Sequence, residues 1–255
     1  MILRPQVSHL KALKLIKGFI DYKIPFNLTR LGDGEICVLK NLDPSKYDTG
    51  ITYGFLKTHW GINYGTDDYK KLRNIMFKSV ENSNFLGIYN FQKRFKDHDK
   101  TNNRICAKWR IEEDFFVKKG IDISDKWLVD FDFVRSYEFG KVENFLKHFD
   151  GIKIDIVTST GNILKDPRLV NNKNINIIYV DKDLLFKDID IENILDKITG
   201  DLVIYGLSTG LKDFGVIVKN TLKKSAIDVG SLMLAWSGVS PRGIYDIEFA
   251  HAINR

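Results

Sequence analysis

The chain has 255 residues, of which 44% are hydrophobic and 28% are charged, and this composition excludes an intrinsically disordered protein. Its formal net charge is +6, and its lysines are spread along the chain instead of forming a basic stripe, so we expect no nucleic-acid partner. No apolar run approaches the roughly 20 residues of a membrane-spanning helix and no secretory signal is visible, so we expect a cytoplasmic protein, free or peripheral to a membrane, with no transmembrane segment.

The N-terminal part predicts a helix, a strand and a tight turn. Apolar residues at helical spacing over residues 6–22 predict an amphipathic helix. A short apolar strand then leads into Arg30-Leu-Gly-Asp-Gly-Glu35, and the apolar stretch after it predicts a second helix that opens near Glu35. Gly32 and Gly34 carry no Cβ, so they leave the backbone free to turn and to approach a ligand closely.

The charged side chains of this turn suit a cation and a phosphate. Asp33 and Glu35 lie two positions apart, so both carboxylates can reach one ion. Mg²⁺ and Mn²⁺ prefer such oxygen ligands and are often coordinated by carboxylates and substrate phosphates together. Arg30 offers a planar fork of donors that suits a phosphate or a carboxylate. A structural interpretation stays open, because Asp33 can bond its own backbone and Glu35 can be a first-turn helix residue favoured by the dipole.

The middle of the chain contains two long polar or aromatic loops. Residues 41–66 are rich in turn formers and aromatics, which indicates either a platform on which a sugar or base stacks or a loop packed over the core. Residues 92–103 are basic and form either a solvated surface or a flap over an anionic ligand. Hydrophobic periodicity predicts the regular elements here: helices over 67–81, 104–119 and 141–149, and strands over 85–91 and 127–134.

From residue 141 onward, strands and helices alternate regularly. The apolar strands predict a parallel sheet covered on both faces, and ligands bind beyond the carboxyl ends of the strands in such sheets. Two of these ends, Thr158-Ser-Thr-Gly161 and Ser208-Thr-Gly210, can present backbone N–H groups and hydroxyls to an anion. The predicted elements are strands over 152–157, 175–180, 202–207 and 226–229, and helices over 189–198 and 211–223.

Other acidic pairs compete with this turn for a metal ion. Strict alternation over 127–134 places Asp130 and Asp132 on one face of a strand, where they can hold a cation, act as a base or face solvent. The chain contains no P-loop, no dinucleotide-binding glycine fingerprint and no zinc-ligand spacing. Asp181 and Asp183 follow an apolar strand, where they have the location of a nucleotide-sugar Asp-x-Asp motif or cap the next element. Asp188 and Asp190 lie in a helix-start region, where Asp is expected as a cap.

Three segments together resemble a known family. Arg30-Leu-Gly-Asp-Gly-Glu35 resembles the R-[FL]-G-D-G-E signature of the GT-D type glycosyltransferases. Asp132-Phe-Val-Arg135-Ser-Tyr137 resembles the mid-chain Asp/Arg/Tyr segment of that family. Gly206-Leu-Ser-Thr-Gly210 and Ala226-Ile-Asp228-Val-Gly230 resemble its closing region, so the similarity runs from about residue 26 to residue 231. The resemblance implies one Rossmann-like α/β domain over residues 1–255, with a mostly parallel sheet and helices on both faces.

The resemblance also implies an activity and a site. The activity is sugar transfer, as by a hexosyltransferase, from a UDP-sugar donor such as UDP-glucose to a glycan or glycoprotein acceptor. Asp33 and Glu35 match the D-x-E pair, which holds Mn²⁺ or Mg²⁺ on the diphosphate of the donor. Asp33, Glu35 and Asp132 are expected to be catalytic, and Asp132 and Asp228 are candidates for the base or for a ribose contact. The residues expected to bind the donor are Arg30, Gly32, Gly34, Arg135, Ser208, Thr209, Gly210 and Asp228.

Other functions stay open at this stage. The chain can be a nucleotide-sugar binding module that lacks turnover. A methyltransferase-like domain is less favoured, because the segment that would be its cofactor loop, residues 154–161, has too few glycines. Residues 232–255 either dock a partner subunit or the acceptor or pack on the core, and the assembly can be a homodimer.

Overall fold

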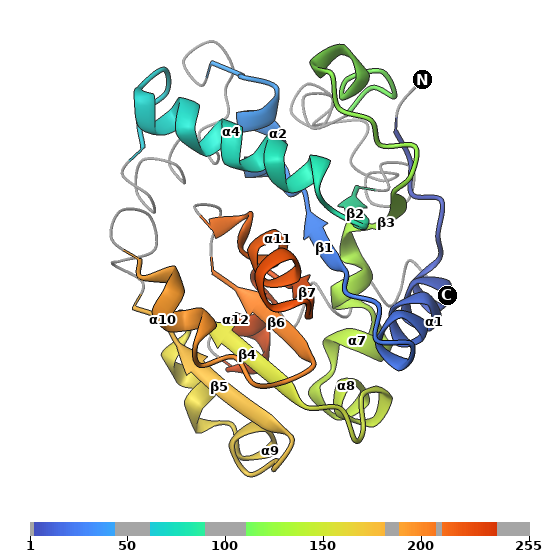
Figure 1. Ribbon diagram of the computed structural model, residues 1–255, viewed down its shortest axis with the longest axis vertical. Coiled ribbons are helices and arrows are strands. Elements are labelled where there is room, and N and C mark those ends of the chain that lie inside the picture. Colours follow the sequence, from blue (N-terminus) through green and yellow to red (C-terminus); the bar gives the residue numbers. More distant parts are fainter. Residues whose placement is uncertain (1–2, 44–61, 90–110, 182–188, 208–210, 239–255) are drawn as a thin grey trace.

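The computed structural model describes residues 3–43, 62–89, 111–181, 189–207 and 211–238, including the backbone but not the side chain of Asp33. In these residues seven parallel strands form one sheet, with helices on both faces (Figure 1). The predicted α/β fold is confirmed. The strands, in the sheet order β3-β2-β1-β7-β6-β4-β5, are β1 Asn27–Arg30, β2 Phe85–Ile88, β3 Trp127–Asp130, β4 Ile154–Thr158, β5 Ile175–Tyr179, β6 Leu202–Gly206 and β7 Ser225–Asp228.

The two halves of the sheet meet between β1 and β7. Every residue of both strands is buried, because helices cover both faces of a parallel sheet. Leu28 of β1 lies opposite Phe85 of β2 on one side and opposite Ile227 of β7 on the other. The first three strands therefore form one half of the sheet, and the last four strands form the other.

One face of the sheet carries a continuous apolar core. At its centre Phe145 packs against Phe139 and Trp236, with ring centroids 5.1 Å and 5.0 Å away. Trp236 also donates a hydrogen bond of 2.7 Å from Nε1 to the carbonyl oxygen of Gly140, which satisfies its one polar atom in the core. The helices of this face are α1 His9–Asp21, α7 Tyr137–Gly140, α8 Val142–His148, α9 Pro167–Val170 and α12 Leu232–Trp236.

The opposite face carries two separate apolar cores. One core lies beneath α2 Asp33–Leu39 and α4 Asp67–Glu81, over the first half of the sheet. The other lies beneath α10 Ile191–Leu195 and α11 Phe214–Ile217, over the second half. Because α11 packs on both β7 and β1, the boundary between these cores lies over the strands where the two halves meet (Figure 1).

Local signals account for the best-predicted helix, α4. Its bounds are Asp67–Glu81, as the periodicity predicts. The side chain of Thr66 accepts a hydrogen bond from the backbone N–H of Tyr69 at 3.3 Å, and Asp67 complements the positive end of the helix. Both signals are local, so the sequence alone is sufficient to define this element.

Two predicted elements are wrong in the described residues. The strand over 127–134 ends at Asp130, whose Oδ1 accepts a hydrogen bond from the N–H of Asp132 at 3.0 Å and starts the 3₁₀-helix η2, Phe131–Arg135. Asp130 and Asp132 therefore do not share a strand face. The helix over 104–119 is absent from residues 111–119, where the carbonyl of Ile111 instead accepts from Leu3 and only a short 3₁₀ turn, η1 Val117–Lys119, forms.

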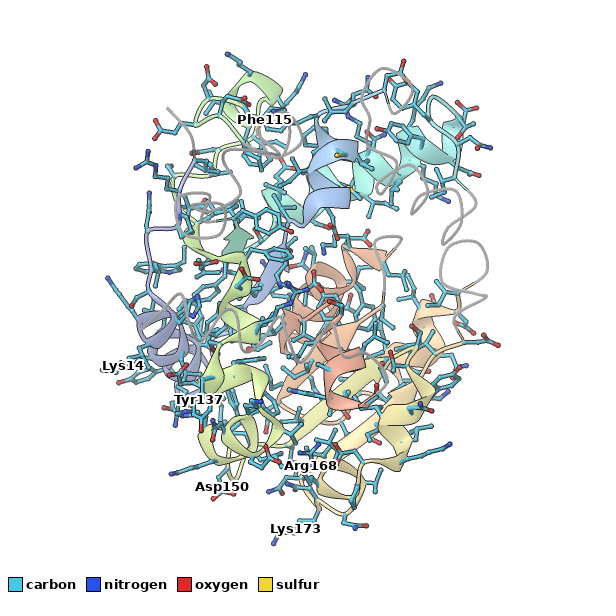
Figure 2. All side chains as sticks on the ribbon, turned by 180° about the vertical axis from the view of Figure 1, so that it is seen from behind. Lys14, Phe115, Tyr137, Asp150, Arg168 and Lys173 are labelled. Atoms are coloured by element: carbon cyan, nitrogen blue, oxygen red, sulfur yellow. The ribbon has the colours of Figure 1, made fainter. Side chains whose placement is uncertain are left out.

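The predicted helix over 211–223 is α11 followed by a π-helical turn, η6 Val218–Leu222. The remaining short helix is the 3₁₀-helix η3, Gly161–Lys165. The charged residues Lys14, Asp150 and Lys173 lie at the outer rim of the molecule (Figure 2). Within the described ranges, no helix combines the length and apolar character needed to span a bilayer.

Several predictions fall outside the described residues and stay predictions. These are residues 44–61 of the predicted aromatic loop over 41–66, the basic loop over 92–103, Asp183, Asp188, residues 208–210 and the C-terminal residues 239–255. Of the acidic pairs, Asp190 is the N-cap of α10, and its Oδ1 accepts from the N–H of Asn193 at 3.0 Å. This contact confirms the capping interpretation for Asp190.

Candidate active site

A cluster of charged side chains lies at the carboxyl ends of β1 and β7. Arg30 is the last residue of β1 and Asp228 is the last residue of β7. Glu35 comes from α2, and Lys212 comes from the turn between β6 and α11. Parallel strands bring their carboxyl ends to one edge of the sheet, where ligands bind in such folds.

Lys212 joins two carboxylates from opposite halves of the chain. Its Nζ lies 2.9 Å from Oε1 of Glu35 and 2.5 Å from Oδ2 of Asp228. The side chain of Lys212 is only 7% exposed. Burial lowers the pKa of Lys212, but the negative charges of Asp228 and Glu35 outweigh it and leave the pKa above its ordinary value. Lys212 is therefore a charged ammonium at neutral pH.

Asp228 is fixed by backbone donors on two sides. Its Oδ1 accepts from the N–H of Gly230 at 3.0 Å, and its Oδ2 accepts from the N–H of Arg30 at 3.4 Å. Gly230 has a φ of +50°, in the left-handed region, and a Cβ there would lie 2.9 Å from Nη1 of Arg30. A glycine is therefore required here both by the backbone and by the space around Arg30.

The guanidinium of Arg30 is buried between η2 and the turn that follows β7. Its Nε donates to the carbonyl of Phe131 at 3.1 Å and its Nη1 donates to the carbonyl of Val229 at 2.8 Å. Its Cζ lies 3.9 Å from the centroid of the Phe131 ring, a cation–π contact. Burial and the nearby charge of Arg135 lower the pKa of Arg30 to about 10. Among the described residues Nη2 of Arg30 has no hydrogen-bond partner.

Arg135 and Asp132 extend the cluster from η2. Nη1 of Arg135 lies 3.3 Å from Oδ1 of Asp132, and both side chains are buried. Nη2 of Arg135 donates to Oγ of Ser231 at 2.7 Å, so the arginine connects η2 to the turn before α12. The Cζ of Arg135 lies 5.4 Å from the ring of Phe131, which thus contacts two guanidinium groups.

The glycine turn at the start of α2 brings Glu35 close to the backbone. Gly32 is the N-cap of α2 and has an extended backbone with a φ of −81°, so it is not needed for a left-handed conformation. A Cβ at Gly32 would instead lie 2.7 Å from Oε2 of Glu35, so the glycine provides space for this carboxylate. The side chain of Asp33, the other half of the predicted pair, lies outside the description.

Three solved structures of domain of unknown function 1792 are similar to this chain. One, described as a distinct glycosyltransferase fold, has a TM-score of 0.55 at 14% identity and covers 97% of this chain and 83% of its own. Another, described as a new glycosyltransferase from Streptococcus sanguinis, has a TM-score of 0.56 at 11% identity and covers 96% of this chain and 87% of its own. The chain has this glycosyltransferase fold.

The third structure, a selenomethionine-substituted form of the same domain, has a TM-score of 0.52 at 15% identity and covers 97% of this chain and 83% of its own. No protein-family model matches the chain, and no curated protein matches it. At these identities the similarity establishes the glycosyltransferase fold alone. The chemistry of the site is therefore inferred from the residues of the charged cluster.

The cluster fits a cation on chemical grounds. Two carboxylate oxygens converge on the ammonium of Lys212, so this glycosyltransferase fold holds a positive charge at the carboxyl edge of its sheet. Glu35 supplies a hard oxygen ligand, and Mg²⁺ or Mn²⁺ is commonly held by one or two carboxylates together with substrate phosphates. Among the side chains that are described, no group of three or more His, Cys, Asp or Glu residues comes together as a set of metal ligands.

The structure brings together most of the described residues that the sequence singles out. Glu35 and Asp228 contact Lys212, with Gly32 beside Glu35 and the backbone of Arg30 bonded to Asp228. Arg135, which pairs with Asp132, joins Arg30 through the ring of Phe131. Gly34 lies within α2, and residues 208–210 are not described. Three members of the cluster were not identified as site residues from the sequence: Phe131, Lys212 and Ser231.

A signal for Lys212 exists in the sequence. Lys212 lies two residues after Ser208-Thr-Gly210, the segment predicted to bind an anion. A positively charged side chain so close to a predicted anion site is the signal that could have identified it. Phe131 stands between the two acids of the predicted strand, but an apolar residue there is indistinguishable from a core residue. Its ring contact with Arg30 could be found only from the fold.

Proposed function

We propose that this protein is a metal-dependent glycosyltransferase that moves a hexose from a nucleotide diphosphate sugar, of the UDP-glucose type, to a glycan or glycoprotein acceptor. The observation that carries the proposal is the buried charge cluster around Lys212, at the carboxyl edge of a glycosyltransferase fold. Sugar transfer releases a diphosphate, and such a leaving group needs positive charge placed beside it before the reaction begins.

The residues of the chain have separate roles in this proposal. Asp33 and Glu35 would hold Mn²⁺ or Mg²⁺, which supplies charge neutralisation on the departing diphosphate. Arg135, anchored by Asp132 and Ser231, orients its guanidinium at the same edge of the sheet. Because backbone carbonyls accept from Nε and Nη1 of Arg30, that residue mainly fixes the geometry, while its Nη2, which has no partner among the described residues, would contact a donor.

The two other acids also differ in what they can do. Asp228 already accepts from two backbone N–H groups and pairs with Lys212, so it is suited to hold the cluster together or to contact the donor. Asp132 lies beside Arg135 and is our candidate for the base that accepts a proton from the acceptor hydroxyl. Gly32 leaves space for the carboxylate of Glu35.

The direct test is release of UDP from UDP-sugars in the presence of Mn²⁺, with and without candidate acceptors. We expect turnover that chelation abolishes and that Asp33→Ala and Glu35→Gln each reduce by about a hundredfold or more. Asp67→Asn is a matched control, since Asp67 also begins a helix but is exposed and lies outside the cluster. Full activity of folded Asp33→Ala protein would refute the proposal.

The same protein preparation separates the alternatives. A nucleotide-sugar binding module would bind UDP with Mn²⁺ and release no product with any donor and acceptor. A methyltransferase-like domain would be stabilised by S-adenosylmethionine instead of UDP in a thermal-shift screen.

A further inference from the structure

We propose that Lys212 and the divalent cation compete for Glu35, and that the ammonium freed from Glu35 then binds the diphosphate of the donor. This inference rests on the proposed function and adds to it a residue that connects metal binding to donor binding. Lys212 is thereby a donor-binding residue and an internal counter-ion of the free protein.

The starting state is visible in the contacts of Lys212. Its Nζ lies between Oε1 of Glu35 and Oδ2 of Asp228, at 2.9 Å and 2.5 Å, in a position that is almost closed to solvent. Glu35 is the more exposed of the two acids, with 14% of its side chain accessible, compared with 4% for Asp228. A cation that arrives from solvent therefore reaches Glu35 first.

Electrostatic repulsion makes the two cations compete at Glu35. Like charges a few ångströms apart repel strongly in a partly buried site, because little water screens them. A divalent ion bound to Glu35 consequently weakens the ion pair between Lys212 and Glu35. Conversely, the ammonium of Lys212 lowers the affinity of Glu35 for a divalent ion as long as Lys212 stays paired with Glu35.

Asp228 keeps the displaced ammonium in place for a new partner. Two backbone N–H groups fix this carboxylate, from Gly230 and from Arg30, so it does not follow Lys212 or the metal. Lys212 can therefore exchange its contact with Glu35 and retain its contact with Asp228. It lies in the turn after β6, at the sheet edge where phosphates bind in α/β folds, and a lysine is a compact charge on a flexible stem.

The two arginines of the cluster are less able to make this exchange. Arg30 is bound through Nε and Nη1 to backbone carbonyls that cannot change their charge. Arg135 is bound to Asp132 and to Ser231, neither of which belongs to the proposed metal pair. Lys212 alone, among the described cations of the cluster, contacts a proposed metal ligand.

The test measures two affinities that the proposal moves in opposite directions. Mn²⁺ binding without nucleotide is followed by the electron paramagnetic resonance signal of free Mn²⁺, and UDP binding at saturating Mn²⁺ is followed by calorimetry. In Lys212→Met and Lys212→Gln we expect Mn²⁺ to bind roughly tenfold tighter and UDP to bind roughly tenfold weaker than in the wild type. Lys212→Arg keeps the charge, so both affinities stay within about threefold of the wild type.

A control and a second measurement make the result unambiguous. Lys219→Met removes a half-buried lysine outside the cluster and should change neither affinity. If the neutral variants do not fold, acetylation of Lys212 in the wild-type protein is mapped by mass spectrometry. We expect Mn²⁺ alone to increase labelling of Lys212 and UDP to reverse that increase.

The outcomes distinguish this inference from the proposed function. If the wild type binds Mn²⁺ and UDP but the neutral variants bind Mn²⁺ no tighter, the competition is refuted and the glycosyltransferase proposal stands. A purely structural lysine would weaken both affinities together, which also refutes it, as would labelling that does not respond to Mn²⁺. If the wild type binds neither Mn²⁺ nor UDP, both proposals fail.

Discussion

Substitution of Gly230 by alanine tests how firmly the cluster is held. Gly230 has a φ of +50°, and a Cβ there would lie 2.9 Å from Nη1 of Arg30. A left-handed alanine costs about 1 kcal/mol. Arg30 cannot move aside easily, because Nη1 donates to Val229 at 2.8 Å and the guanidinium stacks on Phe131. Loss of this buried, charged hydrogen bond adds about 2 kcal/mol, for a total of about 3 kcal/mol.

Gly151→Ala is the matched control for the backbone term. Gly151 also has a positive φ, of +78°, but no atom lies within 4 Å of the position that its Cβ would occupy. We expect Gly151→Ala to lose about 1 kcal/mol of unfolding free energy and Gly230→Ala to lose about 3 kcal/mol, or roughly 6–12 °C in the melting temperature. Urea denaturation followed by circular dichroism measures both losses. Equal losses in the two variants would show that Arg30 moves freely, and the fixed geometry described for the cluster would be wrong.

Three further predictions follow from single contacts. Gly32→Ala keeps a backbone that alanine can adopt but places its Cβ 2.7 Å from Oε2 of Glu35. We therefore expect the rate of UDP release to fall at least about tenfold, while the melting temperature stays within a few degrees of the wild type. Unchanged turnover would contradict this prediction. A side-chain hydrogen bond from Arg168 (labelled in Figure 2) lowers the pKa of Asp166. The ionised Asp166 therefore stabilises the folded state above the ordinary carboxyl pKa, and this contribution is lost as the pH falls through the lowered pKa of Asp166. The stability difference between the wild type and Arg168→Met should therefore shrink between pH 7 and pH 3 in urea titrations, and a constant difference would rule out the linkage. Trp236→Phe leaves the buried carbonyl of Gly140 in α7 without the indole N–H that donates to it at 2.7 Å. The same urea assay should show a loss of about 1–3 kcal/mol of unfolding free energy. An unchanged unfolding free energy would mean that water replaces the indole as donor.

The predictions from sequence succeed where the signal is local. The helix over 67–81 carries its own cap at Thr66 and acidic residues in its first turn, and α4 has the predicted bounds. The strand over 127–134 fails because a side chain competes with the strand. Asp130 accepts from the N–H of Asp132 and turns the backbone into η2, although the apolar alternation continues through Val134.

The amino-acid sequence by itself determines the parallel α/β architecture, because largely apolar strands that alternate with helices are buried on both faces of a parallel sheet. Only the tertiary structure decides that Glu35 meets Lys212, 177 residues later, and that Arg30 meets Asp228, 198 residues later. The reason is the strand order. The last strand inserts beside the first, and nothing in the local pattern of β1 or β7 specifies which strand will be its neighbour.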